Sequence, residues 1–270
     1  MPELPEVETT RRGIAPHCEG KAVARLTIRD SRLRWPVPDD LPELLAGQTL
    51  RQADRRAKYL LLRFDHGTVL VHLGMSGSLR VITDGSSPLK HDHIELLFND
   101  GTLLRFNDPR RFGCWLWSTE PDRHILLANL GPEPLSGEFS GAYLHRKAQG
   151  RKTPVKSFLM DNRIVVGVGN IYANEALFKT GIHPNRAAGR VSAGRYHQLC
   201  EAVKETLSGA ILMGGTTLRD FVNSDGKPGY FAQSLQAYGR GGLPCFNCQR
   251  PLKEIRMNQR TTVYCSHCQR

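Results

Sequence analysis

Four cysteines near the end of the sequence are spaced as metal ligands. Cys245 and Cys248 form one C-x2-C pair, and Cys265 and Cys268 form a second pair after 16 intervening residues. Two matched pairs at this separation place four thiolates around one tetrahedral Zn²⁺, whereas a redox-active dithiol would account for only one pair. His267 lies between the last two cysteines, but four sulfurs already complete a closed site. The spacing therefore predicts one structural zinc ion per chain, with no part in the chemistry.

The sequence around these cysteines is strongly basic. Between Arg240 and Arg270 there are six Lys and Arg residues and one acidic residue, Glu254. The whole chain carries a formal net charge of +11. Lys and Arg contacts to phosphates release condensed counterions, so this charge favours a polyanionic partner such as nucleic acid. A solvated charged face that only aids solubility is the alternative.

The N-terminus concentrates prolines and carboxylates. The first eight residues, Met-Pro-Glu-Leu-Pro-Glu-Val-Glu, hold two prolines and three glutamates. Taken as structure alone, Pro2 begins a helix, where its missing N–H costs nothing, and the glutamates favour the positive end of the helix dipole. The acidic start lacks the basic and apolar regions of a secretory signal, and no apolar run approaches the ~18 residues of a membrane span. We therefore expect a cytoplasmic protein with no membrane partner.

The elements that must position these groups change character along the chain. A helix is expected over 3–13, ending near Gly13 and Pro16. From about residue 20 to residue 120 the sequence has short apolar runs, with an Asn-Asp-Gly hairpin signal at 99–101. Short strands at this spacing predict a β-sandwich or a barrel. The clearest predicted strands are 59–62, 68–72, 93–98 and 102–106.

A segment rich in Gly and Pro at 131–137 breaks the strand pattern and indicates a domain boundary. Beyond it the helical period predominates, and the segment 214–242 is a long loop of the kind that is functional or disordered. Asn170 is the expected N-cap of one helix, and Gly181 lies just past its end. The predicted helices are 142–149, 154–160, 170–180 and 192–212. The isolated cysteines, expected to be structural thiols, are Cys18, Cys114 and Cys200.

Seven motifs, dispersed in order over essentially the whole chain, resemble those of the formamidopyrimidine-DNA glycosylases. Gly-Val-Gly at 167–169 alone would be a weak signal, but the set together is highly specific. The motifs are Met-Pro-Glu-Leu-Pro-Glu-Val-Glu at 1–8, Arg-Arg-Ala-Lys-Tyr-Leu at 55–60, His-Leu-Gly-Met-Ser-Gly at 72–77, Lys-His-Asp-His at 90–93, Asp-Pro-Arg-Arg-Phe-Gly at 108–113, Gly-Val-Gly-Asn-Ile-Tyr at 167–172, and the cysteine pairs.

The resemblance implies an α+β multidomain fold. It implies an N-terminal β-sandwich catalytic domain over 1–130, a helix–two-turns–helix DNA-binding domain over 131–235 and a zinc finger over 236–270, with DNA across the cleft between them. The implied partner is double-stranded DNA that contains oxidised bases or abasic sites. A monomer associated with the nucleoid is expected.

The resemblance also implies a mechanism for base removal. After loss of Met1, the secondary amine of Pro2 attacks C1′ of a damaged nucleotide, the base leaves, and a Schiff base remains; β,δ-elimination then removes the sugar. An α-amine with a pKa near ~8 is partly unprotonated at neutral pH and needs little activation. By the same resemblance Glu3 transfers a proton, Lys58 donates a proton or contacts phosphate during elimination, and Arg260 serves the second elimination.

The implied DNA contacts fall into two sets. Extruding a base leaves a void, and apolar side chains commonly act as wedges. The void-filling residues by resemblance are Met75, Arg110 and Phe112, and the other DNA contacts are His91, Arg110 and Arg151. Asn170, at a helix start, is expected to meet a phosphate. The segment Thr216–Tyr230 is expected to be a lid over the flipped base.

The preferred substrates by resemblance are oxidised purines, namely 8-oxoguanine and formamidopyrimidines. Two alternatives remain open. An endonuclease VIII-like glycosylase for oxidised pyrimidines would share the same mechanism. A non-catalytic zinc-finger DNA-binding protein would explain the charge and the cysteines, but it would not explain why a Pro-Glu start accompanies them.

Overall fold

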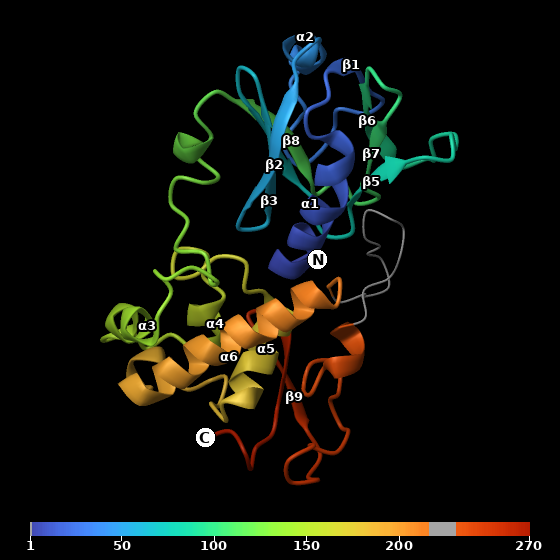
Figure 1. Cartoon of the computed structure of the whole chain (residues 1–270). Helices are drawn as coiled ribbons and strands as arrows, with labels where there is room; N and C mark the ends of the chain where they lie inside the picture. The colour runs from blue at the N-terminus through green and yellow to red at the C-terminus, as the bar shows by residue number, and fades with distance from the viewer. Residues whose placement is uncertain (1, 216–230) are drawn as a thin grey trace. The chain divides into compact units, whose positions relative to one another are not determined.

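The computed structural model describes residues 2–215 and 231–270 (Figure 1). Its contacts divide the chain into two compact units. Of the described residues, the first unit comprises those up to Ala128 together with 213–215. The second unit comprises Asn129–Leu212 and Phe231–Arg270. Among the described helices, none is both long enough and apolar enough to cross a membrane.

The first unit is built on two four-stranded antiparallel sheets. One sheet has the order β1-β6-β7-β5 and the other β2-β3-β4-β8. Apolar side chains from both sheets form one core, and the rings of Phe106 and Trp115 meet edge to face across it with centroids 5.9 Å apart. The predicted sandwich is therefore confirmed. The strands are β1 Val23–Ile28, β2 Leu50–Arg56, β3 Tyr59–Phe64, β4 Thr68–His72, β5 Ser78–Ile82, β6 Asp92–Phe98, β7 Leu103–Asn107 and β8 Cys114–Ser118.

Helix α1 spans Leu4–Cys18 and packs against the sandwich. The predicted end near Gly13 and Pro16 is wrong, because the helix continues through both residues. Ile14 and Cys18 are fully buried in the core, and this burial outweighs the weak helix propensities of Gly and Pro. The described part of this unit also holds the short helix α2 at Leu41–Leu45 and the 3-10 turn η1 at Pro121–Arg123.

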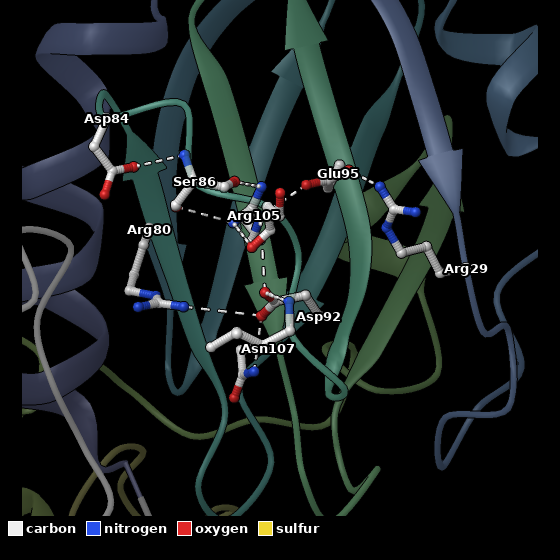
Figure 2. A network of polar contacts seen from close by, with 10 residues as sticks. Arg29, Arg80, Asp84, Ser86, Asp92, Glu95, Arg105 and Asn107 are labelled. Atoms are coloured by element: carbon white, nitrogen blue, oxygen red, sulfur yellow. Dashed lines mark hydrogen bonds and ion pairs between the residues drawn. The ribbon is translucent and has the colours of Figure 1, made fainter.

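Charged side chains line the outer face of the sheet that contains β5, β6 and β7 (Figure 2). Arg105 is only 3% exposed; it donates to Glu95 Oε1 at 2.7 Å and to the main-chain oxygen of Ser86 at 2.7 Å. Asp92 is also buried and accepts the N–H of Leu89 at 2.7 Å. Buried charges persist only where such partners satisfy them. Here they fasten the connection between β5 and β6 to the sheet.

The second unit is helical. Its core is formed by helices α3 to α6, and α6 packs against both α3 and α5. Ser140 caps α3 by accepting the N–H of Tyr143 at 3.1 Å. The bounds are α3 Gly141–Ala148, α4 Val155–Leu159, α5 Asn170–Lys179 and α6 Ala193–Leu212, with 3-10 turns η2 at Ala188–Arg190 and η3 at Phe231–Ser234. The four predicted helices are confirmed.

One predicted helix cap is wrong. Helix α5 has Gly169 at the N-cap, and Asn170 is its first helical residue. The side chain of Asn170 instead bonds to the zinc-finger hairpin, where its Nδ2 donates to the main-chain oxygen of Thr261 at 3.0 Å. Gly181 lies past the helix end with φ +65°, as its position predicts.

The same unit ends in an antiparallel hairpin, β9 Lys253–Met257 and β10 Arg260–Tyr264. A small core surrounds it, and this core includes Leu252, Val263 and the buried Cys245 and Cys265. A core this small does not support independent folding without a staple such as a metal ion.

Candidate functional site

The four cysteines of the two C-x2-C pairs converge beside this hairpin. Their sulfur atoms all lie within 4.8 Å of one another, and the Sγ atoms of Cys248 and Cys265 are 3.5 Å apart. Tetrahedral Zn²⁺ with Zn–S bonds of about 2.3 Å requires sulfurs about 3.8 Å apart. The N–H of Cys265 donates to Gln269 Oε1 at 2.8 Å, which fixes the second pair in place. The geometry fits a closed four-sulfur zinc site.

The zinc hairpin is held against the helical core by buried polar groups. Lys156 on α4 is 2% exposed, and its ammonium group donates to the oxygen of Thr261 at 3.1 Å and to the hydroxyl of Thr262 at 2.7 Å. Asn170 donates to the same Thr261 oxygen. Arg260, the predicted elimination residue, is exposed and directly precedes this anchored pair. The helical core therefore sets the position of the strand that begins with Arg260.

Arg260 also lines a pocket of about 190 Å³ between the hairpin turn and α4. In the turn, Asn258 and Gln259 have positive φ angles of 47° and 60°. Asn258 Nδ2 donates to the hydroxyl of Ser157 at 3.0 Å, which ties the turn to α4. The other residues lining the pocket are Lys156, Met160 and Met257.

At the other end of the chain, Pro2 and Glu3 are buried. Helix α1 begins at Leu4 with Glu3 as its N-cap, so the idea that Pro2 begins the helix is wrong. The N–H of Glu3 donates to Glu6 Oε2 at 2.8 Å, which is half of a capping box. Pro2 therefore stands outside the helix, next to a glutamate that is only 3% exposed.

Lys58 lies in the turn between β2 and β3 and is 9% exposed. The preceding residue, Ala57, has φ 54°, and its oxygen accepts a hydrogen bond from Arg55 at 2.8 Å. Arg55 in turn pairs with Glu8 of α1 at 3.2 Å. A chain of contacts therefore links α1 to the turn that carries Lys58.

Glu8 remains ionised in this network. Burial alone would raise its pKa, but hydrogen bonds from Arg11 and Arg12 outweigh burial and hold the pKa at about 2. Its oxygens accept from Arg11 at 2.8 Å and from Arg12 at 2.8 Å. The charge of Lys58 acts on His72 of β4, whose pKa is lowered to about 4, mainly by burial and then by that charge.

The predicted void-filling residues lie on two neighbouring loops of the first unit. Phe112 is 43% exposed, Met75 is partly exposed, and neither belongs to the core. Arg110 is exposed, with its guanidinium 4.9 Å from the centre of the Phe112 ring. The main-chain oxygen of His91 accepts the N–H of Asp108 at 3.0 Å, so the His91 segment is joined to the same region.

Arg151, the predicted DNA contact in the second unit, is exposed. Its Nε donates to the oxygen of Lys147 at 2.8 Å, and its guanidinium lies 5.6 Å from the centre of the Phe158 ring. These contacts hold the side chain at the surface with its charge accessible.

Three sequence profiles match the chain in order. They are described as "Formamidopyrimidine-DNA glycosylase N-terminal domain" over residues 1–115, "Formamidopyrimidine-DNA glycosylase H2TH domain" over 130–222 and "Zinc finger found in FPG and IleRS" over 242–270. The formamidopyrimidine-DNA glycosylase of Marinobacter nauticus is 68% identical over 270 residues, which are 100% of both chains. The chain belongs to the formamidopyrimidine-DNA glycosylase family. Its four clustered cysteines bind one structural zinc ion.

Solved structures of formamidopyrimidine-DNA glycosylases share the fold. The Lactococcus lactis mutant G226P, in complex with a DNA containing Fapy-dG, superimposes with a TM-score of 0.92 at 30% identity and covers 99% of each chain. The Thermus thermophilus protein superimposes with a TM-score of 0.88 at 38% identity, over 99% of this chain and 98% of the other. The predicted α+β architecture of sandwich, helical region and zinc finger is confirmed.

Two buried charges that join distant segments of the second unit are not indicated by the sequence. One is Lys156; the other is Glu175 on α5, whose carboxylate accepts the N–H groups of Gln236, Ala237 and Tyr238 at 2.8 to 2.9 Å. Glu175 is separated from these residues by 61 to 63 positions, so no local spacing reveals the contact. The predicted lid at Thr216–Tyr230 lies outside the described residues.

Proposed function

We propose that this chain removes oxidised purines, 8-oxoguanine and formamidopyrimidines, from double-stranded DNA through a Schiff base on Pro2, and then cleaves the abasic site by β,δ-elimination. The observation that carries the proposal is the buried pair Pro2 and Glu3, which stands before the first helix of a formamidopyrimidine-DNA glycosylase fold. The related Lactococcus lactis structure, with Fapy-dG in its DNA, supports the substrate class.

In this mechanism the nitrogen lone pair of Pro2 forms a bond to C1′ as the bond between C1′ and the base breaks. The base leaves with the electrons of the broken bond between C1′ and the base, and takes up a proton. The Pro2 nitrogen then loses its proton, the C1′–O4′ bond breaks, and O4′ takes up a proton. The ring is thereby opened, and an iminium joins Pro2 to C1′. The nitrogen of a secondary amine has no proton left to lose at this stage, so the iminium stays electrophilic for elimination.

Glu3 moves protons at this centre, since it is the neighbour of Pro2 and is shielded from water. Lys58 donates a proton or binds a phosphate during the first elimination, in which the sugar loses one of its two phosphates. Arg260 serves the second elimination, which expels the remaining phosphate and frees the sugar. The zinc ion supplies structure to the finger only, because four sulfurs leave no open coordination position.

The DNA contacts follow from the same assignment. Met75, Arg110 and Phe112 fill the void left by the extruded base. His91, Arg110 and Arg151 contact the DNA, and Asn170 meets a phosphate. The assigned domains are 1–130, 131–235 and 236–270. We place the protein in the cytoplasm, on the nucleoid, as a monomer.

Borohydride trapping tests the central step. Reduction of the iminium on 8-oxoguanine duplex should give a covalent protein–DNA adduct with a chain that starts at Pro2. A matched chain that retains Met1 should give none, because its Pro2 nitrogen is an amide. Peptide mapping should place the adduct at Pro2. An adduct at Lys58, or full activity with Met1 retained, would overturn the mechanism.

Duplexes with single defined lesions separate the remaining alternatives. Faster cleavage of an oxidised pyrimidine than of 8-oxoguanine would indicate an endonuclease VIII-like preference. Binding without any cleavage would indicate a non-catalytic DNA-binding protein.

A further inference from the structure

Two glycines bring the loops of Met75 and Phe112 into direct backbone contact. Gly74, with φ +66°, directly precedes Met75, and a Cβ placed on it would lie 2.7 Å from the nitrogen of Gly113 and 2.7 Å from the carbonyl carbon of Phe112. A Cβ on Gly113 would lie 2.5 Å from the oxygen of His72. No side chain fits at either position, so one loop cannot shift without moving the other.

Each loop is also fixed by one side chain from its own flank. His72 Nδ1 accepts the N–H of Gly74 at 2.9 Å, and Asp108 Oδ2 accepts the N–H of Gly113 at 2.7 Å. Asp108 is fully buried, and its main-chain oxygen is 2.9 Å from His93 Nε2. His72 and Asp108 therefore fix the backbones of Gly74 and Gly113, the two glycines at which the loops meet.

We propose that His72 and Asp108 are positioning residues that lock the loops 72–77 and 108–113 into one rigid insertion unit. Met75 and Phe112 then enter the DNA together, from a surface that is already ordered. This inference rests on the void-filling role given to both side chains under the proposed function. A preformed unit costs less ordering entropy on binding than two independent loops.

The chemistry of His72 suits this role. Only an unprotonated Nδ1 can accept a hydrogen bond, and His72 lies among groups that disfavour its protonation. Its ring contacts that of Tyr59, with centroids 4.9 Å apart. The positive charges of Lys58 and Arg34 act on it, and it is largely buried. At neutral pH the bond to Gly74 is therefore maintained.

The first test compares alanine variants at two glycines that have the same positive φ. Gly74 and Gly85 both have φ +66°, but a Cβ on Gly85 meets nothing within 4 Å. Both substitutions carry the same local strain, and only Gly74→Ala forces the two loops apart. We expect Gly74→Ala to lower the preference for 8-oxoguanine duplex over undamaged duplex by about tenfold, as measured by the ratio of Kd values. Gly85→Ala should stay within about twofold of the unsubstituted chain.

The second test uses substitutions at His72 itself. His72→Asn places an amide oxygen close to the position of Nδ1 and keeps the acceptor, whereas His72→Leu removes it. We expect lesion preference to be retained in His72→Asn and to fall by about tenfold in His72→Leu. Asp108→Asn keeps an acceptor and should retain lesion preference, whereas Asp108→Ala removes the acceptor and should lower it by about tenfold. Thermal unfolding of each variant identifies any that fail to fold.

Failure of this inference can be distinguished from failure of the proposed function. Borohydride trapping on a single-stranded abasic oligonucleotide needs Pro2 but leaves no void to fill, so Gly74→Ala and His72→Leu should trap as well as the unsubstituted chain. If the unsubstituted chain does not trap, the proposed function is wrong. If it traps but Gly74→Ala matches Gly85→Ala, or His72→Leu matches His72→Asn in lesion preference, the insertion unit is wrong.

Discussion

The ammonium group of Lys156 lies 2.7 Å from the hydroxyl oxygen of Thr262, so a buried charge of the helical core is satisfied inside the zinc hairpin. The second partner of Lys156, the oxygen of Thr261, belongs to the same strand. Arg260 immediately precedes these two residues in β10. The hydrogen bonds of Lys156 therefore help to fix the position of Arg260.

Lys156→Met should loosen the hairpin without removing the zinc. The loss of the donor takes a hydrogen bond from the buried hydroxyl of Thr262, at a cost of about 1–3 kcal/mol, while the oxygen of Thr261 keeps its bond from Asn170. We expect faster amide hydrogen exchange in β10 and a smaller share of product from the second elimination. Lys152→Met, which alters an exposed lysine near α4, is the control and should leave both unchanged. Unaltered exchange in β10 would show that Lys156 does not anchor the hairpin.

Cys265→Ser should release the zinc ion, disorder the finger and abolish DNA binding, while the β-sandwich remains folded on its own core. Native mass spectrometry and a DNA-binding assay measure the two effects. His267→Ala is the matched control, because His267 lies between two ligands but is not one of the four clustered cysteines. A freshly purified, active enzyme that carries no metal would contradict the structural role of zinc.

Phe112→Ala and Arg151→Ala should have different binding profiles. Phe112 matters only when a base is extruded, so its loss should weaken binding to lesion duplex more than binding to undamaged duplex. Arg151 contacts phosphate, so its loss should weaken both equally and reduce the salt slope by roughly one. Titrations at several salt concentrations measure both. Identical profiles would mean that the two roles are wrongly assigned.

Glu3→Gln should slow removal of 8-oxoguanine by about a hundredfold or more, because the amide cannot transfer the proton. Cleavage of a ready-made abasic site should fall less, since no base has to leave. Single-turnover kinetics on both substrates give the comparison. Equal losses on the two substrates would assign Glu3 to a step other than base removal.

His72 should make the stability of the enzyme depend on pH. Its pKa is about 4 in the folded chain and about 6.5 when unfolded, so between these values the unfolded state binds more protons. The contribution of His72 to the free energy of unfolding is fully present above pH 6.5 and is lost as the pH falls toward 4. The free energy of unfolding should therefore fall by about 2 kcal/mol between pH 7.5 and pH 5. Urea unfolding of the unsubstituted chain and of His72→Asn should differ in pH dependence by this amount. Parallel curves would show that His72 is not responsible.

The parts of the site that the sequence could predict are those encoded by local spacing. The C-x2-C pairs identify the zinc ligands, and short apolar runs identify strands such as β6. The predicted end of α1 is wrong because the burial of Ile14 and Cys18 depends on distant strands, which local spacing does not reveal. The bond between Lys156 and Thr262 joins positions 106 residues apart, and no pattern near either residue suggests it.

The three isolated cysteines bear on the conditions in which such an enzyme operates. Burial raises the pKa of Cys18 and Cys114 to about 12 and that of Cys200 to about 11. Peroxide attacks the thiolate rather than the thiol, so these sulfurs resist oxidation at neutral pH. Among the cysteines, the thiolates open to oxidants are therefore those of the finger. Oxidation severe enough to eject the zinc ion would abolish DNA binding while the β-sandwich stays folded.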